Sequence, residues 1–166
     1  VGVKAENWLD EIIYNPPALN LIYTLPIYQP YANEYDYKHY KFLGPSVYKR
    51  QSESFDFVKR DRPVVYISLG TIVKGSLSFY NQCIDAFRNE NVDVIISAGK
   101  QYNKIKNIPE HIHIYNHVPQ LEVLNNADVF ITHGGMNSIS EAYVTKTPMV
   151  MIPMGSDQYV NARCAK

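Results

Sequence analysis

The stretch Phe130–Ala142, FITHGGMNSISEA, decides the fold. Its apolar start predicts a buried strand that ends at His133. Gly134 and Gly135 then permit a tight turn, because glycine adopts backbone conformations that other residues avoid. The residues that follow, as far as Lys146, predict a helix. A strand that leads into a helix through such a turn is typical of α/β proteins.

The pattern around this stretch repeats the same alternation. Apolar runs predict strands, and apolar residues at helical spacing predict the helices between them. We expect strands at 64–70, 92–99, 111–118, 128–133 and 148–154, and helices at 76–89, 119–127 and 135–146, with a further helix from 158. Strands that are apolar on both faces indicate a Rossmann-like parallel sheet flanked by helices.

Composition narrows the classes of partner. The 166 residues carry 16 basic and 16 acidic side chains, so the formal net charge is zero. This balance argues against a nucleic-acid partner. Apolar runs stay shorter than the roughly 18 residues of a membrane span. Two scattered cysteines, Cys83 and Cys164, do not make a disulfide framework. We therefore expect a cytoplasmic protein without a membrane span.

The organisation along the chain is uneven. Residues 1–50 hold eight of the fourteen tyrosines, and 51–62 are polar without a steady period, as in a linker. Residues 63–166 form the predicted α/β domain. The chain begins with Val1 and stops inside a helical pattern, so we expect a piece of a longer protein whose C-terminal end is missing.

Polar residues gather where ligands bind in such folds. Open parallel sheets bind ligands outside the carboxyl ends of their strands. Four loops are predicted at that edge, and they hold the unusual residues of the chain. The loops are Ser68–Thr71, Asn116–Gln120, His133–Ser138 and Gly155–Gln158.

The loop from His133 has the chemistry of a phosphate site. A helix N-terminus presents free N–H groups and a positive dipole end to an anion. His133, Asn137 and Ser138 add side-chain donors, and the backbone at Gly135 is bare. Glu141 lies on the same helical face, and a neutral diol such as a ribose suits it better than a phosphate. The alternative is that SISE, Ser138–Glu141, is only a capping box.

The other three loops have weaker patterns. Asp157 and Gln158 can bind sugar hydroxyls, although Asp157 also suits an ordinary helix cap. Ser68 and Thr71 can contact phosphate or sugar oxygens, although a polar turn explains them equally well. In HVPQ, a rigid Pro119 and a flat apolar rim can hold a base, although a helix that starts at Pro119 explains that motif better on its own.

A metal cofactor is not expected. His111, His113 and His117 share one face of a predicted strand, but no Cys or carboxylate accompanies them. The chain also lacks an Asp-x-Asp pair, which metal-dependent transferases commonly use to hold a diphosphate. A helix dipole would then stabilise the leaving group. The glycine spacing from Gly70 resembles a P-loop, but Ser76 replaces its lysine, so that interpretation is rejected.

Three segments together resemble the family 1 nucleotide-sugar glycosyltransferases of the GT-B type, nearest to their bacterial, macrolide glycosyltransferase-like branch. The segments are VVYISLGT, YNHVPQLEVLNNADVFITHGGMNSISEA and TPMVMIPMGSDQYVNAR. Residues 1–50 also resemble the end of that family's acceptor domain. The resemblance implies a C-terminal nucleotide-sugar-binding domain of a GT-B fold, truncated in this chain.

The resemblance also implies roles for single residues. Val118 and Gln120 would border the uracil, and Glu141 would bind the ribose. The diphosphate would lie against His133, Gly135, Asn137 and Ser138, with Ser68 and Thr71 lining the phosphate–sugar region. Asp157 and Gln158 would bind the transferred sugar, and a glutamine at the last position resembles the users of glucose.

The implied reaction transfers a sugar, from UDP-glucose by this resemblance, to a hydroxyl of a small hydrophobic acceptor with inversion. The family's catalytic base is a histidine of the N-terminal domain, so no catalytic residue is expected in this chain. Three rival hypotheses are a stand-alone subunit that needs a separate acceptor-domain chain, a sugar-nucleotide epimerase of the same fold, and a degenerate interaction module.

Overall fold

The structure is a computed structural model that describes residues 19–48, 55, 61–70 and 75–165. The chain divides into two compact units, Val1–Ser46 and Val47–Lys166. The predicted boundaries at residues 50 and 62 stay predictions, because most of the residues between them lie outside the described ranges.

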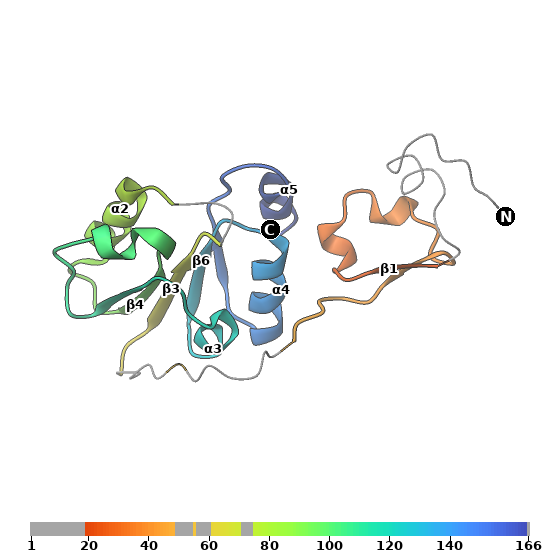
Figure 1. The fold of residues 1–166 in the computed structure, drawn as a ribbon. Helices are drawn as coiled ribbons and strands as arrows, with labels where there is room; N and C mark the ends of the chain where they lie inside the picture. Colours follow the sequence, from red (N-terminus) through yellow and green to blue (C-terminus); the bar gives the residue numbers. More distant parts are fainter. Residues whose placement is uncertain (1–18, 49–54, 56–60, 71–74, 166) are drawn as a thin grey trace. The chain divides into compact units, whose positions relative to one another are not determined.

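The larger unit is built on a five-stranded sheet with the order β5-β4-β3-β6-β7 (Figure 1). Every neighbouring pair is parallel, which confirms the predicted α/β class. The central strand β3 pairs with β4 on one side and with β6 on the other. The strands are β3 (Val64–Ser68), β4 (Asp93–Ser97), β5 (Ile112–Tyr115), β6 (Val129–Thr132) and β7 (Met149–Met151).

The helices follow the predicted order with small shifts at their ends. Ser76 begins α2 as its N-cap, and its Oγ accepts a hydrogen bond from the N–H of Phe79 at 3.1 Å. Pro119 is the N-cap of α3 and not its first residue. A 3-10 helix, η3 (Gly99–Lys104), was not predicted. The α-helices are α2 (Leu77–Phe87), α3 (Gln120–Leu124), α4 (Met136–Thr145) and α5 (Gln158–Cys164).

The core lies on both faces of the sheet. On one face α2 packs Tyr80 and Ile84 against alternate residues of β3 and β4. On the other face α3 and α4 cover Tyr66 and Phe130, whose rings stack with centroids 4.9 Å apart. Because β3 contributes to both faces, all five of its residues are buried.

Two carboxylates bind partners at the amino end of the sheet. Asp128 accepts the backbone N–H of Val64 at 2.8 Å and so joins the starts of β3 and β6. Asp93, with its side chain 1% exposed, pairs with the Arg62 guanidinium at 2.5 Å. Both aspartates therefore serve the start of the sheet.

The smaller unit contains two short parallel strands, β1 (Asn20–Ile22) and β2 (Tyr40–Phe42). Two 3-10 helices lie between them in the chain, η1 (Pro26–Tyr28) and η2 (Ala32–Glu34). Tyr35 supports β2 by edge-on ring contacts with Tyr40 and Phe42. Among the residues that the structure describes, no helix is long and apolar enough to cross a membrane.

Candidate functional site

The candidate site lies at the carboxyl ends of β3 and β6. From β3 the chain runs outward to β4 and β5, then returns to the opposite side of β3 as β6. Ser68 and Thr132, the last residues of the two strands, are register partners. The loops that follow them therefore leave the sheet side by side, and this reversal of strand order is where open α/β sheets bind ligands.

His133 joins these two loops. A Cβ atom built on Gly70 would lie 2.7 Å from its Cε1, and one built on Gly135 would lie 2.6 Å from its Nε2. Real Cβ atoms do not approach so closely, so the imidazole ring rests against two stretches of bare backbone. Gly70 also has a φ of +76°, which favours glycine. The two glycines thus leave room for the ring between the loops.

The electrostatic surroundings of His133 are mixed. Partial burial lowers its pKa below the usual value, and the carboxylate of Asp157 acts in the opposite direction. Burial disfavours the charged imidazolium, so the neutral ring is the main form at neutral pH. A neutral ring can donate one N–H to an anion.

The first turn of α4 is not closed by a cap. Gly135 is the N-cap of this ten-residue helix and has no side chain to accept the first N–H groups. Ser138 is its third residue, so it cannot begin the helix and the capping-box alternative is wrong. Asn137 is exposed and Ser138 is buried at this end. Amide donors and a positive dipole end are therefore available here for an anion.

Gln120 connects α3 to α4. Its Nε2 donates to Glu141 Oε2 at 2.6 Å and to Ser138 Oγ at 3.3 Å. Its Oε1 accepts from the Tyr66 hydroxyl at 3.2 Å. Three predicted site residues are thereby brought together, although they belong to two different helices, α3 and α4. Glu141 is half-buried, and its other carboxylate oxygen can still accept a hydrogen bond.

The loop before α5 is held from within. Gln158 is buried, and its Oε1 accepts the N–H groups of Met154 at 2.8 Å and Gly155 at 3.2 Å. Asp157 is the N-cap of α5, but its side chain does not cap the helix. Its Oδ2 accepts from Asn161 Nδ2 at 3.2 Å instead. Asp157 stays exposed.

The remaining predicted residues differ in placement. Ser68 is buried and accepts the N–H of Gly70 at 3.4 Å, so it shapes the turn after β3. Val118 is 1% exposed and packs in the core beneath α3 and α4. Its predicted place beside a nucleobase stays a prediction. Thr71 lies outside the described residues.

Two residues at the site were not predicted. Tyr66, on β3, contacts Gln120. Asn161, on α5, donates to the Gly134 carbonyl at 2.9 Å. Both residues are almost fully buried. Both could have been found from the sequence, because buried polar groups need partners. Tyr66 brings a hydroxyl to an otherwise apolar strand, and Asn161 brings an amide to the inner face of a helix.

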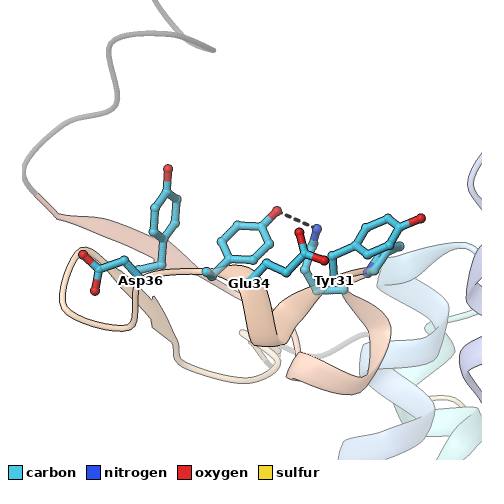
Figure 2. Close-up of a pocket in the computed structure, with 7 residues that line it drawn as sticks. Tyr31, Glu34 and Asp36 are labelled. Carbon is cyan, nitrogen blue, oxygen red and sulfur yellow. Dashed lines mark hydrogen bonds between the residues drawn. The ribbon is translucent and has the colours of Figure 1, made fainter.

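A hollow of about 470 Å³ lies in the smaller unit, and Figure 2 shows the side chains along it. Tyrosines and two carboxylates line it. The Asp36 carboxylate is already bound by His39 Nδ1 at 2.6 Å and by the N–H of Lys38 at 2.9 Å. Its pKa is lowered by that N–H and by His39. Glu34 and Tyr31 are exposed. None of the residues predicted to bind the donor lines this hollow.

Among the described residues, no three or more His, Cys, Asp or Glu side chains lie together so that they could hold a metal ion. The Nε2 of His111 donates to the carbonyl of Phe87 at 2.9 Å, which links the residue before β5 to the last residue of α2.

Comparisons with known proteins identify relatives of this chain. The family model described as UDP-glucoronosyl and UDP-glucosyl transferase matches residues 47–166. The protein named uncharacterized UDP-glucosyltransferase YdhE of Bacillus subtilis is 42% identical over 162 residues, which are 95% of this chain and 40% of that protein. Oleandomycin glycosyltransferase of Streptomyces antibioticus is 30% identical, over 96% of this chain and 40% of its own length.

A solved structure extends the likeness to the fold. The crystal structure of the glycotransferase of kitacinnamycin superposes with a TM-score of 0.83 at 31% identity, over 93% of this chain and 41% of that one. The chain thus spans about two fifths of the length of these relatives.

Proposed function

Because this chain belongs to the UDP-glucoronosyl and UDP-glucosyl transferase family, we propose that its larger unit is the donor-binding part of an inverting glycosyltransferase. The observation that carries the proposal is the junction of Gln120, Ser138 and Glu141 beside the uncapped start of α4. One side of this junction offers donors for a diphosphate. The other offers a carboxylate for a diol.

The donor is a UDP-sugar in this proposal. The diphosphate lies against His133, Asn137, Ser138 and the backbone at Gly135. Helix N–H groups and neutral donors stabilise the charge of the departing UDP, so no metal ion takes part. Charge-assisted hydrogen bonds of this kind contribute roughly 1.5–3 kcal/mol each.

The ribose and the sugar lie on either side of the diphosphate. Glu141 accepts the ribose hydroxyls, with Gln120 beside it and towards the uracil. Asp157 accepts the hydroxyls of the transferred sugar, and Gln158 offers its amide group while its oxygen holds the loop. The name of YdhE supports glucose as that sugar.

The whole enzyme transfers the sugar to a hydroxyl of a small hydrophobic acceptor in this proposal. The base that deprotonates the acceptor lies outside this chain, since His133 is reserved for the diphosphate. The oxygen of the acceptor displaces UDP from the anomeric carbon, which inverts that centre.

Calorimetric titration with UDP and UDP-glucose, in buffer containing a chelator, tests donor binding. We expect saturable binding by the wild type, and about 10- to 100-fold weaker binding by Glu141→Ala, which loses charge-assisted bonds. Ser138→Ala is expected to weaken binding as well. Glu90→Ala removes an exposed carboxylate after α2 and serves as the matched control. A folded wild type that binds neither nucleotide would refute the proposal.

A further inference from the structure

We propose that Tyr66 is a positioning residue that orients the Gln120 carboxamide and, through it, the carboxylate of Glu141. Its hydroxyl lies 3.2 Å from Gln120 Oε1. This inference rests on the proposed function, because the carboxylate of Glu141 is the group that would bind the ribose.

The chemistry of the three side chains fixes which group donates in each of these hydrogen bonds. A carboxylate only accepts, so the amide group of Gln120 must face Glu141, 2.6 Å away. Its Oε1 then faces Tyr66, whose hydroxyl is the donor in that contact. The hydroxyls of Ser68 and Ser97 also interact with the Tyr66 hydroxyl. Burial raises the pKa of the Tyr66 hydroxyl far above its usual value, so the hydroxyl keeps its proton.

The ring of Tyr66 is fixed independently of its hydroxyl. It is 1% exposed and stacks on Phe130 with an interplanar angle of 9°. The central strand β3 thus sets the position of the hydroxyl, and Gln120 follows it. Without this donor, the carboxamide of Gln120 can turn, and neither Glu141 nor Ser138 keeps a fixed partner.

The consequence is specific for the ribose. Tyr66 does not reach the ligand itself. Its effect passes chiefly through Glu141, which lies 2.6 Å from Gln120, and less through Ser138 at 3.3 Å. It should therefore strengthen the binding of nucleotides that present a ribose diol more than the binding of nucleotides without one. A residue that merely supports the fold would change the affinity for both kinds of nucleotide alike.

Tyr66→Phe tests this, because it removes the hydroxyl and keeps the stacked ring. Calorimetry would compare UDP with 2′,3′-dideoxy-UDP on the 166-residue chain. We expect the preference of the wild type for UDP to fall about three- to tenfold in Tyr66→Phe, the effect of one hydrogen bond. Tyr80→Phe, which removes a buried hydroxyl on the opposite face of the sheet, should leave the preference unchanged.

A readout without nucleotide separates this inference from the proposed function. In the wild type, NMR spectra should show two distinct Gln120 side-chain amide protons that exchange slowly with solvent. In Tyr66→Phe these protons should exchange faster and move closer in shift. Unchanged amide protons, or an equal loss of affinity for both nucleotides, would overturn the role of Tyr66. Failure of the wild type to bind UDP would overturn the proposed function, while the amide protons would still decide the role of Tyr66.

Discussion

The two ends of the central sheet use their polar residues in opposite ways. At the amino end, Asp128 binds the backbone of β3 and Asp93 binds Arg62. At the carboxyl end, Gln120 bridges Glu141 and Ser138, and one oxygen of Glu141 remains for a ligand. The carboxylates of Asp128 and Asp93 are paired within the fold and stabilise it. Glu141 is held through one oxygen only, so its other oxygen can bind a ligand. Substitutions at the two ends should therefore separate stability from affinity.

The largest expected effect is on stability, at the amino end. Asp93→Ala leaves the partly buried guanidinium of Arg62 without its partner, and breaking a buried ion pair costs about 3–5 kcal/mol. Chemical denaturation should show this loss. Asp85→Ala breaks an exposed pair with Arg88 on α2, and it should cost about 0–1 kcal/mol. Equal losses in the two variants would remove the distinction between buried and exposed pairs.

The next effect is on affinity, at the carboxyl end. Gly135→Ala places a methyl group 2.6 Å from His133 Nε2 and must push the imidazole aside. The φ of Gly135 is −68°, so the change adds crowding without backbone strain. We expect UDP to bind about 10-fold more weakly, the loss of one charge-assisted bond. Gly155→Ala, whose Cβ meets no atom within 4 Å and whose φ is not positive, controls for the general cost of an added methyl. Unchanged affinity in Gly135→Ala would mean that His133 does not contact the diphosphate.

A smaller effect is expected from Asn161. Its Nδ2 holds both the Gly134 carbonyl and the Asp157 carboxylate, so Asn161→Ala frees the proposed sugar-binding group. UDP-glucose should lose affinity by about threefold more than UDP does, within the range of one neutral hydrogen bond. Calorimetry with the two ligands gives the ratio directly. A ratio that stays at the wild-type value would place Asp157 away from the sugar.

Much of the fold could be predicted from the sequence alone, whereas contacts between distant loops could not. Apolar runs and helical spacing predicted every strand of the sheet, because a parallel sheet buries its strands on both faces. Gly134 and Gly135 predicted the tight turn between β6 and α4. The ring contact with Gly70 was not predicted, because it joins two loops that are 63 positions apart in the chain.

Other features depended on tertiary contacts. Ser138 and Glu141 fit a capping box in sequence, and only the true start of α4 at Met136 decides against it. Similarly, Gln120 is the first residue of a short helix, and nothing in its neighbourhood along the chain predicts a bond to Glu141. The pattern of apolar residues could not predict the role of the Tyr66 hydroxyl, because that pattern treats a tyrosine in a strand as a core residue.

The smallest expected effect is the pH dependence of donor binding. Partial burial holds the pKa of free His133 below its usual 6.5, against the pull of the Asp157 carboxylate. A bound diphosphate favours the imidazolium and raises that pKa, so binding takes up a proton. Affinity should therefore increase as the pH falls from 8 through the raised pKa of the complex, and level off below the lowered pKa of the free protein. UDP-glucose is the suitable ligand, because its diphosphate carries no proton in this range. A nearby opposite charge shifts a pKa by about 1–3 units when buried and less at a half-exposed site, so we expect the affinity to change about threefold.

Calorimetry from pH 5.5 to 8 measures this change in affinity. His133→Gln should give a flat profile, and His111→Gln, which alters a histidine bound to Phe87, should keep the slope. A slope that persists in His133→Gln would assign the proton to another group and detach His133 from the diphosphate.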